Sequence, residues 1–116
     1  MAQLLLHYLS ESEVIKMNRL TITIPVKDND KVDLPELHAK ARAFLVKACG
    51  AFSSIAVHGQ WEDPTDNQLY YDNSIRYEVL VDATLDILYP LTKLVKEEGK
   101  QKCVLLTSEE VNVECQ

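Results

Sequence analysis

The chain has 116 residues, 47% of them hydrophobic, which is enough to form one core without a structural metal or a disulfide framework. Its formal net charge is −6, whereas nucleic-acid-binding domains usually concentrate Lys and Arg on one surface. These features predict a single soluble domain and argue against nucleic acid as a partner.

The cysteines and the N-terminus bear on the cellular compartment. Three cysteines are too few for a disulfide framework, and their odd number would leave one thiol unpaired in an oxidising compartment. The apolar residues Leu4–Leu6 follow no basic region and precede a polar segment, unlike a signal peptide or a membrane span. We therefore expect a cytoplasmic protein without membrane contact.

The first 18 residues allow two interpretations. The segment Leu4–Leu9 fits either a strand or the start of an amphipathic helix that continues through Val14 and Ile15. We treat residues 1–18 as an N-terminal extension and expect one domain over residues 19–116.

The next elements are a strand and a helix. Apolar residues alternate with polar ones from Leu20 to Val26, which predicts a strand with one buried face and with Pro25 near its end. Asp33, followed by Pro35 and Glu36, predicts a helix start, and Gly50 predicts the helix end. The helix between them carries an apolar stripe at helical spacing.

A long hairpin is predicted after this helix. Residues 54–61 and 73–83 each alternate with a period of two, and the residues between them favour turns. We expect Ile55, Val57 and Trp61 to face the core with Ile75, Tyr77, Val79 and Val81. The loop from Glu62 to Asp72 would then project from the sheet.

The C-terminal part predicts a second helix and a last strand. Leucines at helical spacing predict a regular helix from about Ile87 to Gly99, with Pro90 tolerated in its first turn. Residues 103–107 then read as a short strand, and residues 111–115 as an extended tail.

This order of elements predicts an α+β domain of the ferredoxin-like type. Strand, helix, strand, strand, helix and strand form a βαββαβ sandwich, with two helices on one face of an antiparallel sheet. The combination Gly59-Gln60-Trp61, a short acidic turn and Tyr77-Glu78-Val79-Leu80-Val81 resembles small uncharacterised bacterial and phage-type proteins with ferredoxin-like folds. This resemblance covers the central third of the chain and implies the fold, without a catalytic motif.

The predicted parity of the hairpin places a candidate site on the uncovered sheet face. His58 would lie near Arg76 or Glu78, so that an imidazole, a guanidinium and a carboxylate could bind an anion or perform acid-base catalysis. The alternatives are that these residues only stabilise the sheet, or that the face, with Ala56 and Leu80, forms a dimer interface.

The projecting hairpin is the candidate partner-binding surface. It combines carboxylates with aromatic side chains of the kind that anchor protein interfaces, although the same aromatics could pack back on the sheet edge. The candidate residues are Trp61, Glu62, Asp63, Asp66, Tyr70 and Tyr71. Their spacing matches no EF-hand loop, and the chain lacks zinc, P-loop and dinucleotide motifs, so no metal and no cofactor is expected.

These features favour a non-enzymatic binding or interaction module that acts as a homo-oligomer, a homodimer in its simplest form, with a possible protein partner. One version is an accessory protein of a mobile element that inhibits a host protein. The alternative is a small acid-base enzyme, or a ligand sensor, that uses His58, Glu78 and Arg76.

Overall fold

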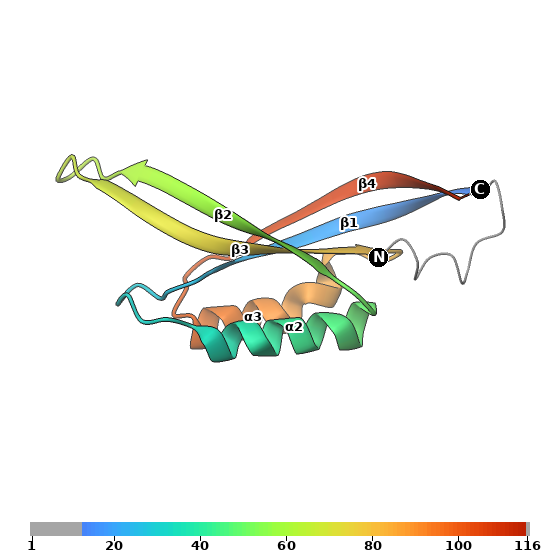
Figure 1. The fold of residues 1–116 in the computed structure, drawn as a ribbon, viewed down its shortest axis with the longest axis horizontal. Coiled ribbons are helices and arrows are strands. Elements are labelled where there is room, and N and C mark those ends of the chain that lie inside the picture. Colours follow the sequence, from blue (N-terminus) through green and yellow to red (C-terminus); the bar gives the residue numbers. More distant parts are fainter. Residues whose placement is uncertain (1–12, 116) are drawn as a thin grey trace.

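The computed structural model describes residues 13–115, which form a four-stranded antiparallel sheet with two helices on one face (Figure 1). Across the sheet the strand order is β2-β3-β1-β4. This arrangement confirms the predicted ferredoxin-like fold class. In chain order the elements are β1 (Glu13–Pro25), α2 (Pro35–Cys49), β2 (Ser53–Glu62), β3 (Leu69–Val81), the 3-10 helix η1 (Leu85–Leu88), α3 (Tyr89–Glu98) and β4 (Leu105–Cys115).

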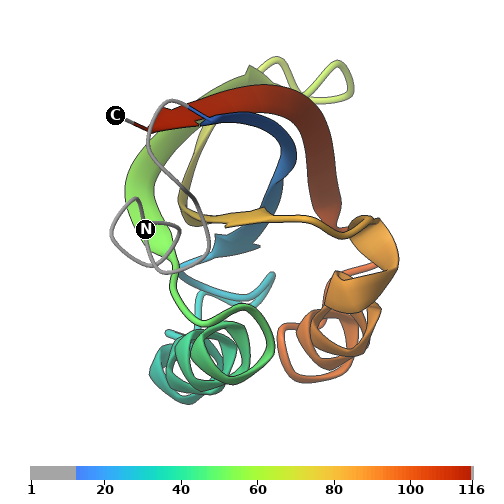
Figure 2. The same cartoon turned by 90° about the vertical axis from the view of Figure 1, so that its right-hand side faces the viewer.

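The hydrophobic core lies between the curved sheet and the helix pair (Figure 2). Leu20, Ile22 and Ile24 of β1 alternate toward the helices, as the sequence predicted, and are completely buried. Each fully buried aliphatic side chain of this kind stabilises the fold by about 1.5–3 kcal/mol. The other core residues are Leu37, Ala41, Leu45, Tyr77, Val79, Leu88, Leu91 and Val95.

The first strand begins earlier than expected. Residues 13–18, which we expected in an N-terminal extension, belong to β1 and pair with β4 over the register Glu13↔Cys115 to Asn18↔Glu110. The expected boundary at residue 18 is therefore wrong, because one strand runs through it. The expectations for residues 1–12 lie outside the described residues.

The helix ends follow the sequence signals in part. Gly50 ends α2 with a φ of 85°, a left-handed conformation that suits glycine. At the other end the N-cap residue is Leu34 without a side-chain cap, so the expected capping by Asp33 is wrong. Pro90 lies in the first turn of α3 as expected, and a 3-10 turn precedes it.

The β2–β3 hairpin extends beyond the ends of the helices (Figure 1) and gives the molecule extents of 57 × 26 × 20 Å. We call its outer part, residues 58–73, the hairpin arm. Its loop is shorter than predicted, because Leu69, Tyr70 and Tyr71 pair with Glu62, Trp61 and Gln60.

The side of the sheet that β2 presents was predicted wrongly. Ile55 pairs with Arg76 and Val57 with Ser74, so Ile55, Val57 and Trp61 lie on the face opposite the helices. The expectation for Ile75, Tyr77, Val79 and Val81 is confirmed, since all four belong to the core or pack against it.

The last strand is continuous. Residues 105–115 form β4, where the sequence suggested a short strand and a separate tail. Within residues 13–115, no helix is long and apolar enough to cross a bilayer.

Candidate functional site

A cleft opens at the end of the sheet where β1 leads into α2. Three segments meet there: the β1–α2 loop, the hairpin arm and the α3–β4 loop. The cleft has a volume of about 480 Å³, within the range of about 300–1,000 Å³ typical of small-molecule sites. We call it the ligand cleft; its walls include Thr23, Lys27, Asp28, Lys31, Trp61, Tyr70, Asp72, Ser74, Gln101, Cys103 and Leu105.

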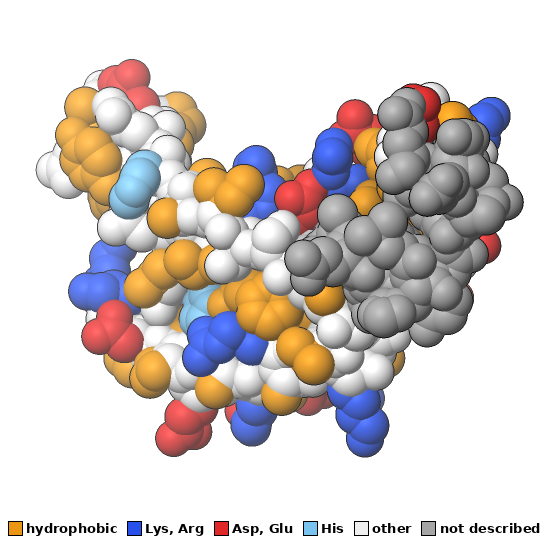
Figure 3. Space-filling model, turned by 45° about the vertical axis from the view of Figure 1, so that its right-hand side comes forward, with side chains coloured by type: hydrophobic (Ala, Val, Ile, Leu, Met, Phe, Trp, Pro, Cys, Tyr) orange, Lys and Arg blue, Asp and Glu red, His pale blue; other side chains and the backbone are white. Residues whose placement is uncertain are grey.

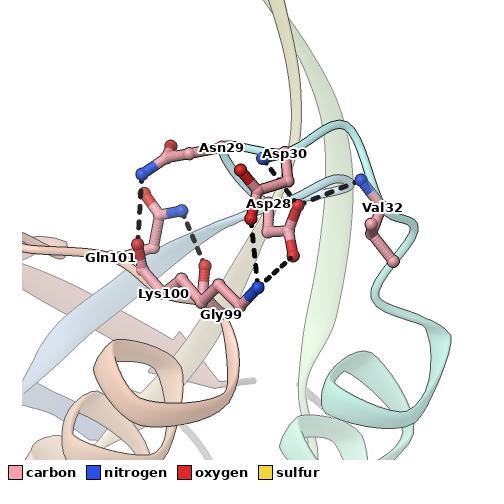
Figure 4. Close-up of polar contacts among 7 residues, drawn as sticks. All are labelled: Asp28, Asn29, Asp30, Val32, Gly99, Lys100 and Gln101. Atoms are coloured by element: carbon pink, nitrogen blue, oxygen red, sulfur yellow. Dashed lines mark hydrogen bonds and ion pairs between the residues drawn. The ribbon is translucent and has the colours of Figure 1, made fainter.

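Asp28 organises the β1–α2 loop. Its side chain is 4% exposed, and its Oδ1 accepts hydrogen bonds from the backbone N–H groups of Asp30 (2.8 Å) and Val32 (3.0 Å) (Figure 4). These bonds, that from Val32 above all, lower the pKa of Asp28 from its ordinary value, with Lys100 contributing in the same direction. The carboxylate therefore stays charged and holds the loop as a fixed wall of the cleft.

Lys100 joins this loop to the α3–β4 loop. Its Nζ lies 3.1 Å from Asp30 Oδ2 and 3.8 Å from Asp28 Oδ2, and its carbonyl oxygen accepts a hydrogen bond from Asn29 Nδ2 at 3.2 Å (Figure 4). The carboxylates raise the pKa of Lys100, Asp30 being the main cause. Two segments that are about 70 residues apart are thus fixed against each other.

The hairpin arm contributes an aromatic wall. The rings of Trp61 and Tyr70 stack with centroids 4.9 Å apart and an interplanar angle of 23°. Trp61 Nε1 donates to Asp72 Oδ2 at 2.9 Å, and the Tyr70 hydroxyl donates to Asp66 Oδ2 at 2.7 Å. The latter bond lowers the pKa of Asp66 and raises that of Tyr70. Such a fixed pair presents a flat π surface on which a planar heterocycle can stack.

Positive and negative charges balance around the ligand cleft. Lys27 lies 4.0 Å from Asp33, and Lys100 is held by Asp28 and Asp30, while Asp72 adds a further carboxylate. Lys31 is exposed and has no ion pair with the described residues. The cleft therefore lacks the surplus of cations that binding of a polyphosphate requires.

A charged cluster continues the site along the uncovered sheet face. Arg19 of β1 bridges Glu78 of β3 and Glu109 of β4, the latter at 3.1 Å, and Ser53 Oγ donates to Glu78 at 3.3 Å. Two carboxylates share one guanidinium in this cluster, which we call the Arg19 cluster. Thr21 and Thr107 form a hydroxyl pair between the cluster and the ligand cleft.

Comparison with known proteins gives matches only among solved structures. A phage SAM lyase in complex with S-methyl-5′-thioadenosine superposes with a TM-score of 0.59 at 17% identity, over 92% of this chain and 93% of that one. The B. subtilis GlnK-ATP complex gives 0.60 at 15%, over 83% and 82%. CutA1 from Oryza sativa gives 0.54 at 10%, over 84% and 82%. These likenesses establish the fold. No protein-family model and no curated protein matches the sequence.

The expected contact of His58 with Arg76 or Glu78 is wrong. His58 pairs with Asn73 and its Nδ1 lies 2.7 Å from Asn73 Oδ1, whereas Arg76 pairs with Ile55 and Glu78 with Ser53. Successive residues of a strand point to opposite faces, so His58 lies on the helix side of β2, whereas Ser53 and Ile55, the partners of Glu78 and Arg76, lie on the other side. His58 therefore cannot share a site with Arg76 or Glu78. Glu78 instead belongs to the Arg19 cluster.

The expected partner-binding residues divide between two surfaces of the hairpin arm. Trp61 and Tyr70 face the ligand cleft, while Asp63 and Asp66 lie at the turn, where each accepts backbone and side-chain hydrogen bonds. Glu62 and Tyr71 are exposed on the other side of the arm. Partner binding by these residues stays a prediction.

His38 is a buried polar residue for which no role was predicted. Its Nε2 lies 2.8 Å from the Pro25 carbonyl oxygen, and its Nδ1 lies 2.7 Å from the Tyr77 hydroxyl. A carbonyl only accepts, so Nε2 carries hydrogen and, in the neutral ring, Nδ1 accepts from Tyr77. The place of His38 beside the apolar stripe of the predicted helix was the sequence signal that could have indicated its burial.

A second hollow lies beside His38, between β3 and the N-terminal half of α2. Figure 3 shows hydrophobic side chains gathered between the sheet and the helix layer. The cavity measures about 420 Å³ and is lined by Val26, Leu34, His38, Arg42, Ile75 and Tyr77 among others. Both ring nitrogens of His38 are occupied by internal hydrogen bonds, so this cavity is the weaker ligand site.

Metal and thiol chemistry find little support in the described part of the chain. It contains no group of three or more His, Cys, Asp or Glu side chains placed to hold a metal ion. Cys49 and Cys103 are free thiols, and burial raises the pKa of Cys49, which disfavours the nucleophilic thiolate.

Proposed function

We propose that this chain is a homo-oligomeric binding protein whose ligand cleft takes a small molecule that contains adenosine. The observation that carries the proposal is the Trp61–Tyr70 stack on the wall of a cleft of about 480 Å³. Stacking on an aromatic side chain is a common way to bind a nucleobase. Two proteins with the same fold are in complex with adenosine compounds, S-methyl-5′-thioadenosine and ATP.

The charges of the cleft favour an uncharged or zwitterionic ligand over a nucleoside triphosphate. Lys100 is occupied by Asp28 and Asp30, and Asp72 would repel a phosphate chain. A thioether nucleoside such as S-methyl-5′-thioadenosine carries no charge, and SAM carries a cationic sulfonium that carboxylates attract. We therefore expect both compounds to bind more tightly than ATP.

Fluorescence titration tests this proposal directly, because Trp61 is the one tryptophan of the chain. Titration with S-methyl-5′-thioadenosine should quench its emission and raise the Tm, as binding to the native state requires. Calorimetry should show that Trp61→Ala weakens binding by about 1–3 kcal/mol, whereas Val46→Ala, on an exposed position of α2, leaves it unchanged. Absence of both the quenching and the Tm shift with all three compounds would refute the proposal.

The uncovered sheet face supports the homo-oligomeric part of the proposal. Ile55 and Leu105 are 54% and 57% exposed on the two edge strands of this face, and the half-buried Val57 lies next to Ile55 along β2. An apolar patch such as that of Ile55 and Val57 is typical of interaction surfaces. Inhibition of a host protein by a mobile-element accessory protein stays a prediction without an observation that favours it.

A second candidate function is the cleavage of SAM. The Arg19 cluster favours it, because two carboxylates share one guanidinium there and the surplus carboxylate can face a sulfonium. The cluster is continuous with the ligand cleft along β1 and β4, through the paired positions Thr23–Leu105, Thr21–Thr107 and Arg19–Glu109. In a balanced step the carboxylate of SAM itself attacks the amino-acid carbon bound to sulfur, the carbon–sulfur bond breaks with its electron pair left on sulfur, and the products are S-methyl-5′-thioadenosine and homoserine lactone. One fold neighbour is a SAM lyase that holds this compound.

Chromatography of SAM after incubation with the protein tests this candidate. We expect S-methyl-5′-thioadenosine to accumulate with the native chain, more slowly with Trp61→Ala, and not above the uncatalysed rate with Glu78→Gln. Binding of S-methyl-5′-thioadenosine with SAM left unchanged would reject the lyase candidate and retain the binding proposal.

A further inference from the structure

A groove with a basic rim lies between α3 and β4, away from the aromatic wall of the ligand cleft. Its volume is about 560 Å³, and its apolar floor includes Tyr89, Val104 and Leu106. Its rim carries the lysines Lys93, Lys96 and Lys102. We call this the lysine groove; it lies on the β4 side of the molecule, where α3 runs beneath the sheet (Figure 2).

The lysines of this groove are free to meet a partner. All three are exposed, and none forms an ion pair with the described residues, although Lys16, Lys27, Lys40 and Lys100 all do. The chain as a whole carries a net charge of −6, so three unpaired cations around one apolar floor form a local reversal of sign. Such a surface fits an acidic partner that also presents apolar side chains.

The hairpin arm has a surface of that complementary kind. On its helix-facing side Glu62 pairs with Leu69 and Gln60 with Tyr71, and the helices end before the arm does (Figure 1). Leu69 and Tyr71 are 53% and 66% exposed. The turn that follows adds two carboxylates, Asp63 and Asp66, whose pKa values are lowered by hydrogen bonds from Thr65 and Tyr70, so both remain charged. We call this side of the arm, with its turn, the acidic arm tip.

We propose that the acidic arm tip of one copy docks into the lysine groove of a second copy. Three acidic groups then face three lysines, and Leu69 and Tyr71 cover the apolar floor formed by Tyr89, Val104 and Leu106. The arm tip is distinct from the aromatic face of the arm, which stays on the ligand cleft. The inference rests on the homo-oligomeric part of the proposed function and assigns its main contact to the arm tip and the lysine groove in place of the uncovered sheet face.

This contact joins two different surfaces, so it is heterologous. After the first contact the copy that donated its arm tip keeps a free groove and the copy that received it keeps a free arm tip, so assembly closes into a ring or continues as an open chain. A variant with a blocked tip can only receive a partner, and a variant with a blocked groove can only donate one. This property separates the proposal from symmetric association through the uncovered sheet face.

The test uses two double variants and light scattering. Glu62→Lys with Gln68→Lys blocks the arm tip, and it spares Asp63 and Asp66, which hold the turn together. Lys93→Glu with Lys96→Glu blocks the groove. Arg42→Glu with Lys47→Glu, on exposed positions of α2, makes the same change of net charge as the groove variant at a different surface and serves as the control. Circular dichroism checks that every variant is folded.

We expect the native chain and the control to assemble, and each blocked variant alone to be monomeric. An equimolar mixture of the two blocked variants should assemble again, because the native groove of one receives the native tip of the other, and the exchanged charges of the blocked tip and the blocked groove also attract each other. Assembly of either blocked variant, or a monomeric mixture, overturns the inference. A monomeric native chain overturns both this inference and the homo-oligomeric proposal, while ligand binding is read separately from the fluorescence of Trp61.

Discussion

Asp28 shows how one enclosed carboxylate shapes the candidate site. Its side chain is nearly inaccessible, two backbone N–H groups bind one of its oxygens, and Lys100 faces the other. An uncharged side chain at this position could still accept the hydrogen bonds from Asp30 and Val32, but it would attract Lys100 less strongly. The residue therefore couples the wall of the ligand cleft to the α3–β4 loop.

This coupling predicts a pH-dependent stability. The pKa of Asp28 is lower in the folded chain than its ordinary value of 3.8, so its stabilising contribution is present above that value and is lost as the pH falls through the folded pKa. Asp28→Asn should lower the Tm at neutral pH, and the difference from the native chain should shrink in acid. Thermal denaturation across the acid range measures this, and a constant difference at every pH would contradict the assignment.

The His38–Tyr77 hydrogen bond should be a measurable part of core stability. Tyr77→Phe keeps the ring but leaves His38 Nδ1 buried without its partner, which should lower the free energy of unfolding by about 1–3 kcal/mol. Urea denaturation gives this value. Tyr89→Phe removes a hydroxyl from a side chain that is 57% exposed and should change it by less than about 0.5 kcal/mol. If Tyr77→Phe and Tyr89→Phe lowered the free energy of unfolding equally, the buried His38–Tyr77 hydrogen bond would contribute no more to stability than an exposed hydroxyl.

At the scale of elements, periodicity predicted the fold but not the orientation of the edge strand. The apolar residues of β1 and β3 point to the helices, and their alternation was sufficient to predict the core. In β2, apolar Ile55 and Val57 alternate with polar residues just as regularly, yet they face away from the helices. Alternation defines two faces, and only the pairing with β3 decides which of them is covered.

The candidate site was harder to predict because it depends on contacts between distant loops. Trp61 and Tyr70 were predicted as a contact surface, but their stacking requires the exact register of the hairpin. The Asp28–Lys100 pair joins loops that no local pattern connects. Likewise, the continuous strand from Glu13 was missed because its first residues gain their order from pairing with β4.

The C-terminal end of α3 predicts a specific cost at Gly99. A Cβ atom at this position would lie 2.6 Å from the Val95 carbonyl oxygen of α3 itself and 3.1 Å from Leu37 Cδ2 of α2. Gly99→Ala should therefore distort the last turn of α3 and lower the free energy of unfolding by about 1–3 kcal/mol. Urea denaturation tests this; an unchanged midpoint and slope would mean that the helix end accommodates the methyl group without cost.

At the scale of the whole molecule, the described chain is too extended to bury all of its large apolar side chains within one copy. Its Cα radius of gyration is 16.5 Å, whereas a compact domain of this length has about 13 Å. The difference comes from the hairpin arm and the long β1–β4 pair, which reach past the two ends of the helices (Figure 1). An arm with exposed Leu69 and Tyr71 is most stable when another surface covers it.

The charges that would guide this covering predict how assembly responds to salt. The lysine groove and the acidic arm tip are exposed, so their attraction is screened as the Debye length falls from about 10 Å in 0.1 M salt to about 3 Å in 1 M salt. We expect the dissociation constant of the native assembly, measured by sedimentation, to rise by roughly tenfold or more over this range. Binding of the uncharged S-methyl-5′-thioadenosine to the variant with the blocked groove, Lys93→Glu with Lys96→Glu, should not change with salt, since stacking on Trp61 involves no ion pair. Assembly that strengthens with salt would instead point to the apolar residues of the uncovered sheet face as the main contact between copies.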